Sequence, residues 1–367
     1  MTIYDIAKEL GVSPTTVSQA LNGNTRVAAK TRARVTEFAM HNGFRRSEQA
    51  RNFRLKRTFN IAIVVYNIDN DFWCGFVKAV EDALGEEYNV LLCNTEGNPE
   101  KEKKIFFNLM QRNVDGVIVQ PASDEKKHFM DMVRNSIPVV LLEETEEPEL
   151  SFVKGNDHLA AYRSTKVCIE QGYRKIAFLS TPPDCVGGRE WIRGFKQAVA
   201  EEDCIGEVLY VKETTCEEVK KVFLPRVGEF PLVFCDTHLI CMLLRVLFTH
   251  HVRIPEDLSL IAWSNKYFLS YMTPSISIIS IPVEEIGRRA AGIILRNLNG
   301  EPHVEKTFID ETLILRESFQ PSAGSPPAGV SGQIQHRLIS YNSNPCGNSF
   351  SSRGRGVLCP TPERKCP

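Results

Sequence analysis

The chain has 367 residues, 43% of them hydrophobic, and its 44 basic side chains nearly balance 45 acidic ones, for a net charge of -1. This length leaves room for two or three domains with sizeable cores. No apolar run approaches the roughly 18 residues that a bilayer-spanning helix needs, and no secretion signal is found, so we expect a cytoplasmic protein with no membrane partner.

The charge is unevenly distributed along the chain. Residues 1–57 hold eleven Lys and Arg against four acidic side chains, a net charge of +7 that leaves -8 for the remainder. A basic end of this kind favours a nucleic-acid partner, because Lys and Arg neutralise phosphates. A merely solvated face is the alternative explanation for such a charge run.

The first 22 residues predict two short helices joined by a tight turn. Thr2 is a candidate N-cap, and Asp5 three residues later completes a capping box. Gly11 supplies the turn, Ser13 caps the second helix, and Pro14 occupies the first helical position, where its missing N–H costs nothing. The pattern is a helix-turn-helix. Short polar side chains suited to the major groove project from its second helix: Thr15, Thr16, Ser18 and Gln19.

A structural three-helix cap is the alternative for residues 1–45, but it leaves these polar positions unexplained. The third helix is predicted over residues 29–42, with a left-handed cap at Gly43 and the hydrophobic Phe44 after it. The basic segment that follows contains a helical stretch, residues 48–53, that is too short to be stable alone.

From residue 60 onward, short apolar strands alternate with helices. The strands are rich in β-branched residues without polar alternation, which is typical of parallel strands buried on both faces. The predicted strands are residues 61–65, 90–93, 116–119, 138–142, 176–179, 207–211, 232–234 and 258–262. Helices are predicted near 72–87, 100–113, 124–135 and 281–291. This rhythm predicts two doubly wound subdomains, and because such sheets bind ligands at the carboxyl ends of their strands, we expect a ligand in the cleft between the two.

The cysteines do not form a recognisable metal or disulfide pattern. The eleven include no Cys-x-x-Cys pair, and His250-His251 lacks a partner at ligand spacing. Five lie within apolar stretches and are expected to be buried, reduced thiols: Cys74, Cys93, Cys168, Cys235 and Cys241.

Two other classes of protein could share parts of this pattern. A free-standing solute-binding protein would share the core but would need a secretion signal and no helix-turn-helix. An enzyme on a Rossmann-like sheet would need a phosphate-binding loop, a nucleophile elbow or metal-ligand spacing, and none of these motifs is found in the sequence. We therefore expect no catalytic residues, no metal and no cofactor.

Several groups of residues stand at fixed spacing near the N-terminus. They read Thr2-Ile-x-Asp-Ile-Ala, Gly11-Val-Ser-x-x-Thr-Val-Ser18, Leu21-Asn22, Thr31-Arg32-x-x-Val35 and Ala50-Arg51. With these motifs the chain resembles the LacI/GalR (lactose-repressor) family of bacterial transcription regulators, and a looser resemblance continues to Arg316. The resemblance implies an all-α helix-turn-helix headpiece and an α/β core of two doubly wound parallel-sheet subdomains, like that of periplasmic binding proteins. It also implies that residues 283–318 return to the first subdomain.

The resemblance implies a sequence-specific DNA-binding transcriptional regulator, and we expect it to act as a repressor. It would bind palindromic, double-stranded operator DNA as a homodimer, under the control of a small-molecule effector that is sugar-like in the family. Our domain prediction is a DNA-binding headpiece at 1–45, a hinge segment at 46–58, an effector-binding and dimerisation core at 59–319 and a disordered tail at 320–367. The tail lacks the leucine heptads by which some relatives form tetramers, which favours a dimer.

The family motifs and the exposed second helix together predict the DNA contacts. In the family, the hinge folds only on operator DNA, where a leucine wedges a base step of the minor groove; Phe53 stands at that position here, and a core role is its alternative. The predicted DNA-binding residues are Thr2, Tyr4, Ser13, Pro14, Thr15, Thr16, Ser18, Gln19, Asn22, Arg26, Thr31, Ala50, Arg51 and Phe53.

The predicted effector residues follow the family with departures. Trp191 replaces an arginine, leaving Arg189 as a nearby substitute, and Ser264 replaces an acid that grips sugar hydroxyls. Because a missing buried hydrogen-bond partner costs about 1–3 kcal/mol, these changes argue against simple transfer of a hexose or purine preference and suggest a flatter, more aromatic site. For the aromatic pair after the first core strand, packing beneath the cleft is the alternative. The predicted set is Phe72, Trp73, Asn156, Arg189, Trp191, Asp236 and Ser264.

Overall fold

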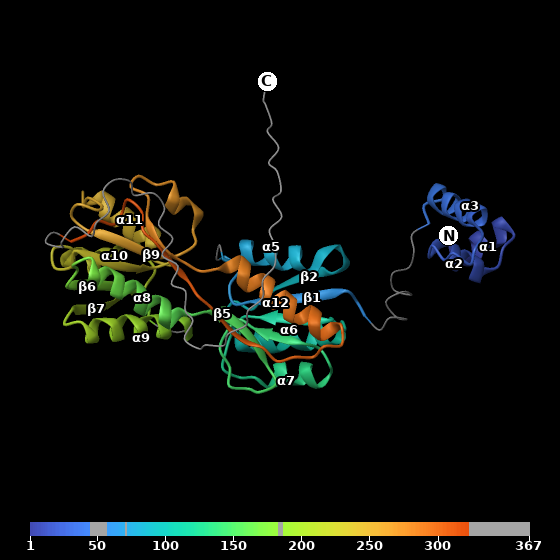
Figure 1. Ribbon diagram of the computed structural model, residues 1–367, viewed down its shortest axis with the longest axis horizontal. Coiled ribbons are helices and arrows are strands. Elements are labelled where there is room, and N and C mark those ends of the chain that lie inside the picture. The colour runs from blue at the N-terminus through green and yellow to red at the C-terminus, as the bar shows by residue number, and fades with distance from the viewer. Residues whose placement is uncertain (45–56, 70–71, 183–185, 323–367) are drawn as a thin grey trace, which may run out of the picture. The chain divides into compact units, whose positions relative to one another are not determined.

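The computed structural model describes residues 1–44, 57–69, 72–182 and 186–322. The first of these ranges forms three helices, α1 (Ile3–Leu10), α2 (Pro14–Leu21) and α3 (Ala29–His41) (Figure 1). The predicted cap after α3 is confirmed, because Gly43 has φ +62° and the Phe44 amide donates to the Ala39 carbonyl at 2.9 Å. Side chains from all three helices and the loop before α3 form a small apolar core: Ile6, Ala7, Val17, Ala20, Val27, Val35 and Ala39.

The rest of the described chain divides into two compact units. Unit 1 comprises residues 57–69, 72–156, 186–187 and 282–310, to which the three N-terminal helices are added, and unit 2 comprises residues 157–182, 188–281 and 311–322. The chain therefore passes between the units after Asn156, Ile281 and Asp310.

Unit 1 is a six-stranded sheet in the order β11-β5-β4-β3-β1-β2, with every pairing parallel. The strands are β1 (Asn60–Val65), β2 (Asn89–Asn94), β3 (Gly116–Val119), β4 (Val139–Leu141), β5 (Ser151–Gly155) and β11 (Lys306–Ile309). Its helices are α5 (Phe72–Leu84), with the 3-10 turn η1 (Gly85–Glu87) after it, α6 (Pro99–Gln111), α7 (Lys127–Arg134) and α12 (Val283–Leu298).

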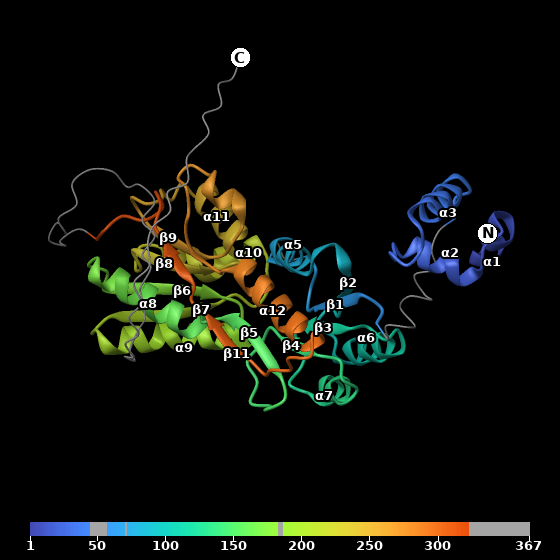
Figure 2. The same cartoon turned by 45° about the vertical axis from the view of Figure 1, so that its right-hand side comes forward.

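The apolar strands of unit 1 explain its layers. All of Ile61–Val65 is buried, as expected of a strand covered on both faces. Ala62 and Val64 share one core cluster with Phe106 of α6 and Phe129 of α7, while α5 and α12 lie side by side on the other face (Figures 1 and 2).

Unit 2 repeats this plan in the order β12-β10-β9-β8-β6-β7. The strands are β6 (Lys175–Ser180), β7 (Ile205–Tyr210), β8 (Leu232–Asp236), β9 (Ser259–Trp263), β10 (Ser277–Ser280) and β12 (Thr312–Ile314). Its helices are α8 (Asp157–Glu170), α9 (Val186–Glu201), α10 (Cys216–Phe223) and α11 (Ile240–Thr249), with the 3-10 turns η2 (Leu224–Arg226) and η3 (Tyr267–Ser270). One core cluster joins α8 and α9 to the sheet and another joins α10 and α11 to it (Figure 1).

The predicted doubly wound architecture is confirmed in both sheets, whose first five strands follow the order 2-1-3-4-5. Two expectations need correction. The segment 283–318 does not return whole to unit 1, because residues 311–322 belong to unit 2. There β12 pairs antiparallel with β10, through Ile278 opposite Ile314, whereas the sequence predicted parallel strands alone.

The expectation of buried cysteines is wrong for Cys74 and Cys241, which are exposed. Each lies on an apolar stretch of helix but on its outer side. Cys93 is half-buried, Cys168 and Cys235 are buried, and burial raises the pKa of all three thiols. Seven cysteines within the described ranges are free, and those ranges contain no cluster of His, Cys, Asp and Glu that could hold a metal ion. The described helices include none long and apolar enough to cross a membrane.

Candidate DNA-binding and effector-binding residues

The helix-turn-helix is built by the caps that the sequence predicts. The Thr2 hydroxyl accepts from the Asp5 amide at 3.3 Å, and the Thr2 amide donates to the Asp5 carboxylate at 2.7 Å. The Thr2 amide, and after it the Thr2 hydroxyl at 2.9 Å, donate to the Asp5 carboxylate and lower the pKa of Asp5. Gly11 then turns the chain with φ +63°, and the Ser13 hydroxyl accepts from the Thr16 amide at 3.0 Å. Both helices are thereby fixed at the ends that meet at the turn.

The caps and buried positions leave one side of α2 open. Val17 and Ala20 are buried, while Thr15 is exposed and Thr16, Ser18 and Gln19 are half-buried. Thr16 also exchanges a hydroxyl hydrogen bond with Ser13 at 2.8 Å, so its side chain takes part in the cap. The Tyr4 side chain is 68% exposed, so packing in the core does not account for this aromatic residue. Its exposure is compatible with the predicted contact to DNA.

The other predicted headpiece residues also reach the surface. Asn22 and Arg26 are exposed and Thr31 is half-buried, while the Arg26 amide donates to the Asn24 side chain at 3.0 Å. The structure adds two tethers that sequence reasoning missed: Arg32 donates to the Asn24 carbonyl and Arg34 to the Leu10 carbonyl. Three predicted DNA-binding residues lie outside the described residues: Ala50, Arg51 and Phe53.

In unit 1, the predicted effector residues lie after the carboxyl ends of β1 and β5. Trp73 is only 4% exposed and packs edge-on against Phe72, at 4.9 Å between ring centroids, and against Phe76 at 5.5 Å. Phe72 is half-buried and stacks on Phe76 at 5.7 Å. Of the aromatic pair, Phe72 is therefore the ring with surface to offer, whereas Trp73 lies beneath it. Asn156 is half-buried, with its amide bonded to the Ile309 carbonyl at 3.0 Å.

In unit 2, the structure joins two of the predicted residues in one polar cluster. Asp236 ends β8 and Ser264 follows the neighbouring strand β9. The Asp236 carboxylate accepts from the His238 amide at 2.8 Å and from the Thr181 hydroxyl at 3.5 Å, and the Ser264 hydroxyl bonds with that of Thr237 at 2.9 Å. Sequence reasoning missed Thr181, although its place directly after β6 was a usable signal.

The two candidates on α9 differ sharply. Arg189 is exposed. Trp191 is 1% exposed and stacks on Trp263 at 4.5 Å between centroids, within the apolar core cluster beneath α8 and α9. Its direct contact with an effector, as predicted from the sequence, does not fit this burial. Trp191 instead faces the sheet. Gly194, three residues later, lies against α8, because a Cβ at Gly194 would lie 2.1 Å from the His158 carbonyl oxygen.

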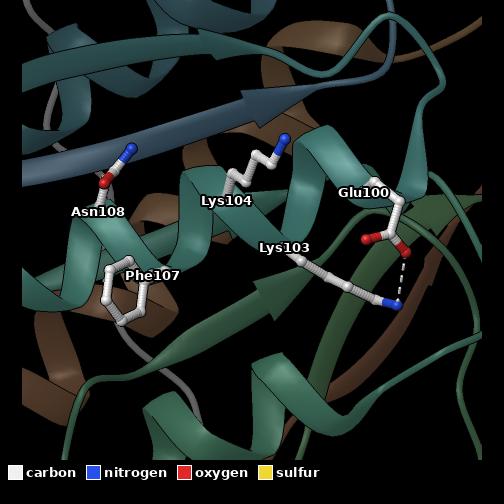
Figure 3. Close-up of a pocket in the computed structure, with 5 residues that line it drawn as sticks. All are labelled: Glu100, Lys103, Lys104, Phe107 and Asn108. Carbon is white, nitrogen blue, oxygen red and sulfur yellow. Dashed lines mark hydrogen bonds and ion pairs between the residues drawn. The ribbon is translucent and has the colours of Figure 1, made fainter.

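A hollow of about 430 Å³ on the outer side of α6 contains none of these predicted residues. The Lys103 ammonium pairs with the Glu100 carboxylate at 3.0 Å, one turn away on α6. Figure 3 shows this pair and the Phe107 ring further along the same helix. Since one helix supplies the whole lining, it is a surface depression without convergent polar groups. It is lined by Glu100, Lys103, Lys104, Phe107 and Asn108.

Comparison with known families covers nearly all the described chain. Residues 2–47 match "Bacterial regulatory proteins, lacI family". Residues 58–215 match "Periplasmic binding proteins and sugar binding domain of LacI family", and residues 165–319 match "Periplasmic binding protein-like domain".

Individual relatives agree with these family matches. The chain is 30% identical over 320 residues to the HTH-type transcriptional repressor PurR of Vibrio atlanticus, covering 84% of this chain and 95% of that one. Among solved structures, a LacI family transcriptional regulator from Silicibacter pomeroyi superposes with a TM-score of 0.70 at 22% identity, covering 86% and 98% of the two chains. A complex of the transcriptional regulator CelR with cellobiose superposes with a TM-score of 0.62 at 23% identity, covering 87% and 100%.

Proposed function

Because this chain belongs to the LacI family of bacterial transcriptional regulators, we propose that it represses transcription by binding a palindromic operator as a homodimer, under the control of a small molecule bound between its two α/β units. One headpiece spans a half-site, so two headpieces related by a two-fold axis read a palindrome. Since the DNA of a bacterium lies in its cytoplasm, the proposal places the protein there.

The observation that carries the DNA-binding proposal is the capped pair α1 and α2. Gly11 and the Ser13 cap fix the turn, and α2 keeps Thr15 and Gln19 at its surface beside the buried Val17. Thr and Gln side chains hydrogen-bond to base edges, and Gln pairs bidentately with adenine. The net charge of +7 over residues 1–57 supplies the attraction to phosphates that such readout needs.

The effector proposal rests on where the polar side chains gather. Asp236, Thr237 and Ser264 lie together after β8 and β9, at the strand ends where doubly wound sheets bind ligands. Carboxylate and hydroxyl groups in this arrangement suit a ligand that presents hydroxyls, and the structural neighbour CelR is bound to cellobiose. We propose a polyhydroxylated, sugar-like effector, for which the half-buried Phe72 ring offers a flat surface from unit 1.

The experiment begins by selecting a duplex from a random library with the full-length wild-type chain. Replacing Gln19 by Ala should weaken binding to the selected duplex by about 1–3 kcal/mol, because a direct base contact is lost, and leave binding to random duplexes nearly unchanged. Lys8→Ala is a matched control on the exposed side of α1, and it should not relax sequence preference.

An equal loss on the selected and random duplexes would make Gln19 a backbone contact or a structural residue. If the wild-type chain selects no duplex at all, the operator-binding proposal itself fails.

A further inference from the structure

The residues that enter β1 are held by a buried carboxylate. The Thr58 amide donates to one Asp115 carboxylate oxygen at 3.0 Å, and the Phe59 amide donates to the other at 2.6 Å. Asp115, 8% exposed, directly precedes β3, so this contact lies at the amino-terminal edge of the unit 1 sheet. The Thr58 hydroxyl adds a bond to the Asn113 carbonyl at 2.8 Å.

The backbone at Phe59 shows that this entry is tightly specified. Its φ of +56° lies in the left-handed region, which a bulky aromatic residue rarely adopts. Such a conformation persists only where the surroundings enforce it. Besides the Asp115 bond, the Phe59 ring packs on Tyr88 at 5.7 Å and its carbonyl accepts from the Asn89 amide at 2.8 Å.

Arg57 links the same entry to the far end of α12. Its guanidinium donates to the Tyr88 hydroxyl at 3.3 Å and to the carbonyl of Leu298, the last residue of α12. A cation at this end is favourable, because the last carbonyls of a helix lack backbone partners and carry partial negative charge. One turn earlier, Ile294 packs against Gly116, where a Cβ would lie 2.8 Å from the Ile294 side chain.

The opposite end of α12 lies beside the start of α5. A Cβ at Gly75 would meet Glu284 at 3.5 Å and Val283 at 3.6 Å, and Phe72 stands one turn before Gly75. The sixteen residues of α12 span about 24 Å at 1.5 Å per residue. Figures 1 and 2 both show α12 running beside α5. One rigid helix thus connects a predicted effector residue with the entry to β1.

We propose that Arg57, Thr58, Phe59 and Asp115 form a hinge anchor, which sets where the DNA-binding end of the chain leaves unit 1 and couples that point to α12. The anchor rests on the proposed function, since it acts on operator recognition. Its residues touch neither DNA nor effector in this role, so they are positioning residues. Within the anchor, the side chains of Arg57 and Asp115 make the hydrogen bonds to the Leu298 carbonyl and to the Thr58 and Phe59 amides.

A direct phosphate contact by Arg57 is the competing explanation, because this residue ends the basic segment 45–57. The two explanations predict different effects. Loss of a phosphate contact weakens binding to every duplex and lowers the dependence of affinity on salt. Asp115 carries a negative charge and cannot bind phosphate, so weaker operator binding after its substitution reports the anchor.

The test compares full-length Asp115→Asn, Arg57→Ala and Arg57→Lys on a duplex selected by the wild-type chain and on random duplexes, over a range of salt concentrations. Hydrogen exchange of the 57–65 segment is measured in parallel. Asp82→Asn and Arg134→Ala are matched controls, because each removes an exposed charge of unit 1 that pairs within one turn of its own helix.

We expect Asp115→Asn and Arg57→Ala to lower the ratio of selected to random affinity at least tenfold, with an unchanged salt slope and faster exchange at the Thr58 and Phe59 amides. Arg57→Lys keeps a donor for the Leu298 carbonyl and should stay within threefold of wild type, as should both controls. The anchor proposal is overturned if both Asp115→Asn and Arg57→Ala exchange faster at the Thr58 and Phe59 amides but keep the wild-type ratio of selected to random affinity. It is also overturned if Arg57→Ala shows a reduced salt slope while Asp115→Asn keeps that ratio. If Asp115→Asn does not fold, the two Arg57 variants decide by the same criteria. A wild-type chain that selects no duplex refutes the proposed function instead.

Discussion

At the scale of single residues, two tryptophans show how aromatic side chains divide between packing and binding. Trp73 and Trp191 follow β1 and β6, where ligand contacts are expected, yet they are 4% and 1% exposed. Trp73 packs against the more accessible Phe72, and Arg189, two positions before Trp191 in the sequence, is exposed. Sequence position predicts that both residues follow the ends of strands, but the direction of a side chain depends on which face of the helix meets the sheet.

Trp191 carries a testable consequence of its burial. Its indole N–H is buried and meets no acceptor within the described residues. Trp191→Phe removes that donor, whose unpaired burial costs about 1–3 kcal/mol, and this gain should offset most of the packing lost with the smaller ring. We expect the free energy of unfolding in urea to change by less than about 1.5 kcal/mol.

Trp191→Ala is the comparison, because it removes the whole ring and should cost about 3–5 kcal/mol. If Trp191→Phe proves as costly as Trp191→Ala, the indole N–H has a strong partner in solution, such as a bound water.

At the scale of elements, strands built around an apolar run could be predicted from the sequence, whereas several short strands that contain polar residues could not. Strands such as Gly116–Val119 are apolar throughout and were predicted with correct limits. The strands β5, β10, β11 and β12 lie outside the predicted runs. They are short and contain polar residues, such as Lys154 in Ser151–Gly155 and the serines at both ends of β10, whose burial depends on pairing with distant segments.

The helix α12 offers an element-scale prediction from its two glycines. A Cβ at Gly287 would lie 2.9 Å from the Phe76 carbonyl oxygen and 3.1 Å from the Ala79 Cβ, so α12 would have to move away from α5. At Gly292 the nearest atom would be 3.6 Å away, on the flexible Arg296 side chain. Gly287→Ala should destabilise the protein by about 1–3 kcal/mol, whereas Gly292→Ala should stabilise it by up to about 1 kcal/mol through helix propensity.

Urea unfolding of the two variants beside wild type checks this prediction. The two substitutions add the same methyl group to the same helix, so any difference reports the close approach of α12 to α5. Equal effects would mean that the helix pair is loose enough to accept a side chain at Gly287.

At the scale of the whole molecule, the proposed effector site draws residues from both units. The family and the fold could be inferred from the headpiece motifs and the strand rhythm, but the ligand could not. Ser264 and Trp191 differ from the family pattern, and each contacts a residue distant in sequence, Thr237 and Trp263 respectively. These contacts exist only in the folded chain, so the sequence alone does not predict which ligand groups the site would accept.

Arg189 provides the cleanest test of that site. A panel of saccharides is screened for thermal shifts of the full-length chain, and any ligand found is then tested for its effect on affinity for the selected duplex. Arg189→Ala should abolish that effect while leaving ligand-free DNA binding within a few tenths of a kcal/mol, since distant sites are usually additive.

The melting temperature serves as the control in this experiment. Arg189 is exposed, so its removal should leave the melting temperature near wild type, whereas Trp73→Ala removes a buried ring and should lower it. A normal response to the ligand in Arg189→Ala would place the effector contact elsewhere.

The order in which the chain supplies strands to the two units has a consequence for its synthesis. Unit 1 lacks α12 and β11 until residue 309 has been made, and unit 2 lacks its edge strand β12 until residue 314. Domains that are continuous in sequence fold one after another as they leave the ribosome. Here unit 1 is complete only after residue 309 and unit 2 only after residue 314, so a nascent chain would carry two incomplete sheets until these residues have been made. Ribosome-bound chains halted before and after this region, probed by proteolysis, should therefore gain resistance in both units over the same short interval.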